Sequence, residues 1–302
     1  MKRTIAAILL CTLLLGCFVG CSGRLKATLT YIVDGEEFYK DTVVGANDYF
    51  GSIGTVPEKG GFVFNGWYFD DGVWEKPLSY TDLNAALTST EYRVYAKWEN
   101  VDLKFNETTR TYSVVGLLLD AGSDIVIPAT YKDFPVTEIA AGAFRGNTSL
   151  SSIVIPDTVT TIGEYAFAEC TALKEIRMPN SVVTVGKGAF SNCASLTSVT
   201  VSTALKQINA ETFYNCSALT EITLPQALVQ ISPRAFASCT ALTSFTIPFR
   251  VISLGAEMLS GIGLTEISYA GNTSDFEKIA KEGFLDGSSV KTVRCLNGDI
   301  SY

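Results

Sequence analysis

The chain has 302 residues, of which 47% are hydrophobic, and its formal net charge at pH 7 is −8. An acidic chain lacks the basic face that nucleic-acid binding requires, so nucleic acid is excluded as a partner. The sequence contains no histidine, which excludes serine–histidine and cysteine–histidine catalysis and any histidine-liganded metal site. We therefore expect a chain with no catalytic residue, no resident metal ion and no cofactor.

Residues 1–20 have the pattern of an export signal. Lys2 and Arg3 form a short positive region, and Ile5–Leu15 is an apolar stretch too short to predict a membrane span. A glycine precedes both Cys17 and Cys21. Both sites resemble the bacterial lipoprotein signal, in which the cysteine is acylated. The resemblance implies an exported chain, anchored through acyl chains to the membrane at the bacterial cell surface. We expect acylation at Cys21, with Cys17 as the alternative; an ordinary secretory signal with incidental cysteines is a further alternative.

Residues 26–99 are expected to form a separate small module. Apolar and polar residues alternate along Thr28–Val33, which predicts a strand. The motifs Gly66-Trp67-Tyr68 and Tyr95-Ala96-Lys97-Trp98 resemble the Listeria–Bacteroides repeat, also called the internalin B-repeat. The resemblance implies a small β-grasp-like domain of bacterial surface proteins.

Aromatic residues are expected to fill the core of this module, because a small domain needs large aromatic burial. The expected core residues are Trp67, Tyr68, Tyr95 and Trp98. Two other readings stay open. Trp67 or Trp74 could stack on a sugar, and Asp70-Asp71-Gly72 could hold calcium, although two acids in a turn usually form a solvated loop.

Residues 100–124 are expected to form an N-terminal cap, with a strand at Tyr112–Gly116 that closes the open end of the following array. From residue 125 to 264 the sequence repeats every 23 residues, and a fixed period of this length indicates a solenoid. The clearest series is Phe144, Phe167, Phe190, Phe213 and Phe236, with Leu259 in the next position. The first coil has five extra residues around Tyr131–Pro135, which predict a protruding loop.

Each repeat unit begins with a strand pattern, as in Leu150-x-x-Ile153-x-Ile155, and Pro156 ends that strand. Ile162-Gly163 begins the return, and Gly163–Phe167 is expected to form a short helical or 3₁₀ turn. The unit closely resembles the BspA-like leucine-rich repeat. The resemblance implies a right-handed, β-rich α+β leucine-rich-repeat solenoid of 23-residue coils, and a surface protein that adheres to or recognises other molecules. It departs from the general leucine-rich repeat, because Thr158 and Ser181 replace the usual asparagine or cysteine after the strand.

A second series at the same period consists of four cysteines, Cys170, Cys193, Cys216 and Cys239. Stacked coils lie ~4.8 Å apart, within the range that a disulfide can bridge, and four thiols could also bind a metal. However, Asn147 occupies the same position in the first repeat, and unpaired cysteine is usually buried. We therefore expect a buried core series, with disulfides and metal binding as alternatives.

Residues that face outward from the repeat strands are the candidate binding face. They are Ser152, Val154, Glu175, Arg177, Ser198, Thr200, Glu221, Thr223, Ser244 and Thr246. Solenoids use such surfaces for partners, whereas β-propensity alone also explains the residues on an exposed strand. Two minor readings are ice binding by the threonines and glycan hydrolysis by Glu175 and Glu221, which are expected to lie ~10 Å apart on an open face.

Residues 265–302 are expected to form a C-terminal cap, with a strand at Leu264–Asn272, a helix at Asp275–Gly283 and a final strand at Val290–Cys295. Taken together, the sequence favours a non-enzymatic, surface-displayed binding or adhesion module for an extracellular protein or glycan. The alternative is a structural cell-envelope component without an external ligand.

Overall fold

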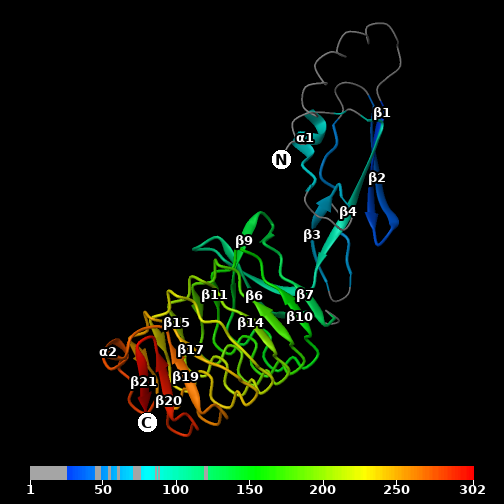
Figure 1. The fold of residues 1–302 in the computed structure, drawn as a ribbon. Coiled ribbons are helices and arrows are strands. Elements are labelled where there is room, and N and C mark those ends of the chain that lie inside the picture. The colour runs from blue at the N-terminus through cyan, green and yellow to red at the C-terminus, as the bar shows by residue number, and fades with distance from the viewer. Residues whose placement is uncertain are drawn as a thin grey trace. The chain divides into compact units, whose positions relative to one another are not determined.

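The structure is a computed structural model that describes residues 26–44, 49–53, 56–59, 62–70, 76–85, 87, 89–118 and 122–302 (Figure 1). Contacts divide the chain into two units: residues up to Pro57 with Gly66–Lys97, and Glu58–Asn65 with Trp98–Tyr302. The candidate lipid-attachment residues Cys17 and Cys21 lie outside the described residues, as do Asp71, Gly72 and Trp74. Within the described ranges, no helix has the length and apolar character needed to cross a membrane.

The N-terminal module contains a four-stranded sheet with the order β2-β1-β4-β3. The strands are β1 (Lys26–Val33), β2 (Glu36–Val44), β3 (Val63–Tyr68) and β4 (Glu91–Glu99), and the helix is α1 (Tyr80–Ala85). Strand β1 is antiparallel to β2 and parallel to β4. The strand expected at Thr28–Val33 is therefore present, as part of β1.

Only one of the four expected core aromatics of this module is buried. Trp67 is 9% exposed and packs edge-on against the fully buried Tyr31, with ring centroids 4.9 Å apart. Tyr68, Tyr95 and Trp98 are half-buried. For Tyr95 the reason is strand alternation, because its neighbours Val94 and Ala96 face the core.

The repeat array begins with a hairpin of β5 (Val101–Asn106) and β6 (Thr111–Leu117), so the predicted cap strand is confirmed. Strand β6 pairs in parallel with β9 (Phe134–Ile139). The extra residues at 131–135, expected to form a protruding loop, form a tight hairpin of β8 (Thr130–Tyr131) and β9. Lys132 and Asp133 adopt positive φ values of 46° and 66°, as a two-residue hairpin turn requires.

Two parallel ladders run along the array (Figure 1). The first holds the expected repeat strands β7 (Asp124–Val126), β10 (Ser152–Val154), β12 (Glu175–Arg177), β14 (Ser198–Thr200), β17 (Thr246–Ile247) and β19 (Glu266–Tyr269). The second was not predicted and lies on the return segment. It continues β9 through β11 (Thr161–Ile162) and β13 (Thr184–Val185), and then holds β15 (Gln207–Ile208), β16 (Gln230–Ile231) and β18 (Ser253–Leu254). The chain therefore forms the predicted solenoid, with two short strands in most coils.

The phenylalanine series is a continuous stack in the core, as predicted. Successive rings from Phe144 to Phe236 have centroid distances of 5.0, 5.2, 5.6 and 5.4 Å, and their planes differ by at most 13°. Leu259, in the next position, is fully buried. Identical side chains therefore lie over one another from coil to coil.

The segment between the return strand and the phenylalanine is a series of turns, so the expected helical or 3₁₀ turn is wrong. Tyr165, Phe167 and Glu169 donate their backbone N–H groups to carbonyl oxygens of the next coil at 2.7–2.9 Å. Tyr165 and Glu169 have positive φ values of 54° and 64°. These N–H groups therefore join neighbouring coils, whereas a helix would use them within one coil.

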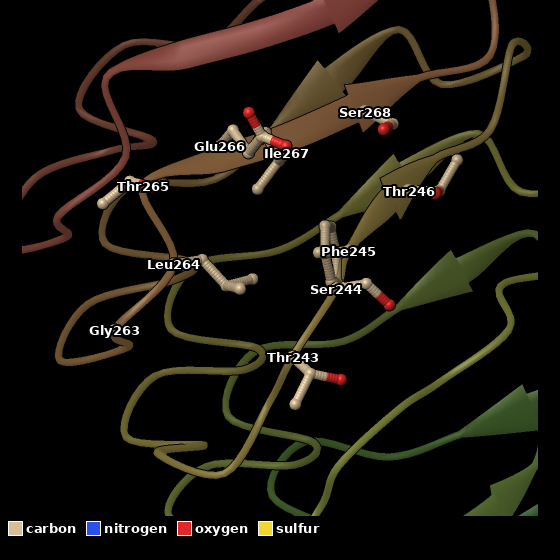
Figure 2. Close-up of a pocket in the computed structure, with 10 residues that line it drawn as sticks. All are labelled: Thr243, Ser244, Phe245, Thr246, Gly263, Leu264, Thr265, Glu266, Ile267 and Ser268. Atoms are coloured by element: carbon tan, nitrogen blue, oxygen red, sulfur yellow. The ribbon is translucent and has the colours of Figure 1, made fainter.

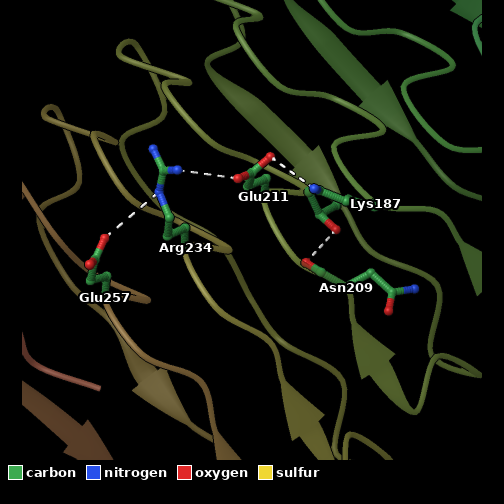
Figure 3. A network of polar contacts seen from close by, with 6 residues as sticks. Lys187, Asn209, Glu211, Arg234 and Glu257 are labelled. Atoms are coloured by element: carbon green, nitrogen blue, oxygen red, sulfur yellow. Dashed lines mark hydrogen bonds and ion pairs between the residues drawn. The ribbon is translucent and has the colours of Figure 1, made fainter. Parts of the chain in front are cut away.

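Charged side chains also connect coils on this turn side of the array (Figure 3). The Glu211 carboxylate forms ion pairs with Lys187 Nζ at 3.8 Å and with Arg234 Nη1 at 3.3 Å, and Arg234 Nε lies 3.8 Å from the Glu257 carboxylate. Because these side chains are partly exposed to water, each ion pair contributes little to stability, about 0–1 kcal/mol.

The four cysteines of the repeat are free and buried. Each thiol donates a 3.1 Å hydrogen bond to a phenylalanine carbonyl oxygen of the preceding coil, as Cys193 Sγ does to Phe167 O. In the first repeat Asn147 Oδ1 instead accepts the backbone N–H of Leu150 at 2.9 Å. No group of histidine, cysteine, aspartate or glutamate suited to a metal ion occurs in the part of the chain that the structure describes.

The C-terminal cap differs from the prediction in two ways. Helix α2 spans only Thr273–Phe276, because Ala280 is drawn into the coil ladder: its N–H donates to Ile252 O and its carbonyl accepts from Leu254 N–H. Strand β20 (Thr292–Cys295) is not the last strand, because the chain turns and pairs back as β21 (Gly298–Ser301).

We expect Phe190→Ala to destabilise the array by about 3–5 kcal/mol, because it opens a cavity in the middle of the ring stack. Each coil contacts only its neighbours, so denaturant unfolding should separate into two transitions. The matched control is Phe249→Ala, which alters a ring that is already 53% exposed. If Phe190→Ala unfolded in a single transition, at the same denaturant midpoint as the unaltered protein, the prediction would be contradicted.

We expect the four buried thiols to resist alkylation in the folded chain. Burial raises the pKa of Cys170 and Cys239 to about 12 and also raises the pKa of Cys193 and Cys216, so the reactive thiolate is scarce up to pH 10. Residue-resolved mass spectrometry after iodoacetamide treatment should show Cys295, which is half-buried, reacting first. After unfolding without reductant all four should react, and protection of any pair at that stage would indicate a disulfide.

Candidate functional site

The strand face is the surface formed by the outward residues of β7, β10, β12, β14, β17 and β19. Strands β12 and β14 are in parallel register, with Glu175 opposite Ser198 and Arg177 opposite Thr200. These four residues are exposed, whereas Ile176 and Val199 between them are buried. Because side chains alternate along a strand, the central residue of each of these strands packs in the core. The residues on either side of it are exposed and free to contact a partner.

The other candidate residues do not all lie on regular strands. Glu221 and Thr223 are exposed, but their segment is not a strand. Ser244 is exposed and precedes β17, and Ser152 on β10 is half-buried. The 23-residue period therefore predicts which residues face outward, but it does not predict where the ladder is interrupted.

A hollow of about 1240 Å³ lies over β10, β12 and β14. It brings together six of the ten candidate residues: Ser152, Val154, Glu175, Arg177, Ser198 and Thr200. Asp157, Asn180 and Thr203 also line it. Sequence reasoning missed these three residues, although each of them directly follows the proline position and they recur at the 23-residue step.

A smaller hollow of about 320 Å³ lies toward the C-terminal end of the same face (Figure 2). Ser244 and Thr246 line it from one coil, and Thr265, Glu266 and Ser268 line it from the next. Sequence reasoning missed Glu266 and Ser268, because the repeat that ends with them is one residue shorter than the others. The two residues therefore do not lie 23 residues after Ser244 and Thr246. Glu221 and Thr223 do not line either of the two hollows.

The charged residues of the face fall into two groups. At its ends they are satisfied internally: Glu266 accepts Arg294 Nε at 2.9 Å and Nη2 at 2.6 Å, a hydrogen-bonded pair that raises the pKa of Arg294. Asp124 accepts hydrogen bonds from Ser152 and Ser151, which hold its pKa below its ordinary value. In the middle, Glu175, Arg177 and Glu221 form no ion pair with any described residue.

Parts of this chain are similar to solved structures of leucine-rich repeat proteins. A leucine-rich repeat protein of T. pallidum is 19% identical, with a TM-score of 0.42, and the match covers 66% of this chain and 80% of that chain. A leucine-rich cell surface protein of Faecalibacterium prausnitzii is 29% identical (TM-score 0.43; 56% and 53% covered), and a leucine-rich repeat protein of Eubacterium ventriosum is 24% identical (TM-score 0.47; 67% and 55%). This chain thus spans about half the length of the latter two. A search of curated protein sequences found no match.

The family model for the BspA type leucine-rich repeat region matches in six copies, over residues 137–265 and 207–298. Together these ranges run from 137 to 298, which is 162 of 302 residues and more than half of the chain. The matched region holds the phenylalanine stack from Phe144 to Phe236, the buried cysteines and most of the strand face. The chain belongs to the BspA-type leucine-rich repeat family.

Proposed function

We propose that this chain is a non-enzymatic binding or adhesion module that presents its strand face to an extracellular protein or glycan. The observation that carries the proposal is the open middle of that face. There Glu175 and Arg177 line the large hollow and have no ion-pair partner among the described residues, and the exposed Glu221 also has none. Exposed charged residues without an internal partner are available to an external one, and solenoids commonly bind partners on such a face.

We further propose that the chain is exported and held at the bacterial cell surface by acyl chains on Cys21, or alternatively on Cys17. The signal-like residues 1–20 support this, as does the description of the Faecalibacterium prausnitzii protein as a cell surface protein. Each buried CH₂ of an acyl chain contributes about 0.8 kcal/mol to membrane attachment. The N-terminal module, with its resemblance to the Listeria–Bacteroides repeat, would then act as a spacer between the membrane and the repeats.

The lipid anchor is tested by labelling producing bacteria with radioactive palmitate. We expect label on the mature chain, its loss in Cys21→Ser and its retention in Cys17→Ser. The reverse pattern would move the attachment to Cys17. Absence of label from the unaltered chain would refute the anchor.

The binding function is tested by probing arrays of glycans and extracellular matrix proteins with the purified protein. Thr200→Trp places a large side chain in the hollow and should weaken binding roughly tenfold or more, because an overfilled contact loses over about 1.4 kcal/mol. Val183→Trp, at a residue 57% exposed just before the return strand β13, is the matched control and should bind normally. Folded protein that binds no array member would favour a structural envelope component instead.

A further inference from the structure

The large hollow coincides with a break in the first ladder. Strand β12 pairs with β14, and β10 pairs with β7, but no ladder joins β10 to β12 among the described strands. Paired parallel strands are held about 4.8 Å apart, whereas an interrupted pair carries no such constraint. The edge of β12 that faces β10 therefore keeps backbone N–H and C=O groups that can bind a ligand in the hollow.

The lining of this hollow suits a polar ligand. Its large apolar members lie mostly beneath the surface, since Ile153, Ile155, Ile176, Met178 and Val201 are each at most 8% exposed. Val154, at 57% exposed, is the strongly exposed apolar residue of the lining, and no described residue of the lining is aromatic. Tight protein–protein contacts centre on aromatic and other large apolar anchors. The exposed side chains of this lining are instead mostly carboxylate, hydroxyl and amide groups, which suit a ligand rich in hydroxyl groups.

Arg177 is the single cation among the described lining residues, and it has no ion-pair partner among them. The planar guanidinium binds a carboxylate through two parallel hydrogen bonds, a geometry that lysine cannot provide. Around it, Glu175 and Asp157 supply carboxylates that accept hydrogen bonds from hydroxyl groups. Thr203 donates its N–H and its hydroxyl to Asn180 Oδ1, at 3.1 and 2.9 Å, so the amide N–H groups of Asn180 remain available as donors.

We propose that the hollow binds an oligosaccharide that carries a carboxylate group, an inference that rests on the proposed binding function. Arg177 binds the sugar carboxylate, Glu175 and Asp157 accept ring hydroxyls, and Val154 contacts an apolar face of the sugar. The volume of about 1240 Å³ exceeds the roughly 300–1,000 Å³ of a typical small-ligand pocket and accommodates several sugar units. Because two acids flank Arg177, densely sulfated or phosphorylated polymers are repelled, and the site selects sugars with isolated negative charges.

The test uses a carboxylated oligosaccharide and the same oligosaccharide with its carboxyl group reduced to an alcohol. Calorimetry with the full protein should show binding of the acid at least roughly tenfold tighter than that of the alcohol, as expected for a charge-assisted hydrogen-bonded pair. Arg177→Met should lose this preference, whereas Arg177→Lys should keep part of it. Arg145→Met, at an exposed arginine that pairs with Glu169 on the turn side, is the matched control and should keep the full preference.

The outcomes separate this inference from the function on which it rests. Equal binding of acid and alcohol, or an unchanged preference in Arg177→Met, would overturn the carboxylated-sugar inference. If Thr200→Trp still abolished binding of another ligand, such as a protein, the binding function would stand. Folded protein with no ligand on any array would refute both.

Discussion

The structure depends on one constraint: each coil lies directly over the preceding coil, so that in the regular repeats a side chain meets its counterpart 23 residues away. Phenylalanine rings stack at 5.0–5.6 Å, thiols reach carbonyl oxygens of the coil before, and turn N–H groups reach carbonyl oxygens of the coil after. The same close stacking explains Gly163, Gly186 and Gly255, because a Cβ atom at any of them would collide with the backbone of the preceding coil.

The constraint also separates stability from recognition. Along a repeat strand the central residue, such as Ile176, is buried in the stack, whereas its neighbours Glu175 and Arg177 are exposed. Exposed residues can change without disturbing the core, so their identity reflects contact with water or a partner. Between β10 and β12 the ladder is interrupted, and the large hollow lies there beside Glu175 and Arg177, which form no ion pair with a described residue. The large hollow is thus a candidate binding site that the stacked coils support from beneath.

The stacked core and the exposed residues of the strand face could be predicted from the sequence, because residues that are 23 positions apart occupy equivalent places in successive coils. The period predicted the ring stack and the outward residues, and the local pattern at Tyr112–Gly116 predicted the β6 cap strand. Neither pattern could predict the second ladder, since two-residue strands such as β11 carry no alternation that stands out from a turn. Helix α2 was predicted too long, because Ala280 pairs with the preceding coil, and tertiary pairing overrides local propensity. The hollows are formed by side chains from neighbouring coils, and Asp157, Asn180 and Glu266 became visible as lining residues only in three dimensions.

Residue-resolved hydrogen exchange measures the central constraint most directly, because it reports whether individual amides are held between coils. The N–H groups of Phe167, Phe190 and Phe213 donate to the next coil at 2.7, 2.9 and 2.9 Å. Coil-over-coil stacking predicts that these three amides exchange together and among the slowest in the chain. Exchange as fast as that of the exposed turn residue Asn297 would contradict the stacked arrangement and the strand face built on it.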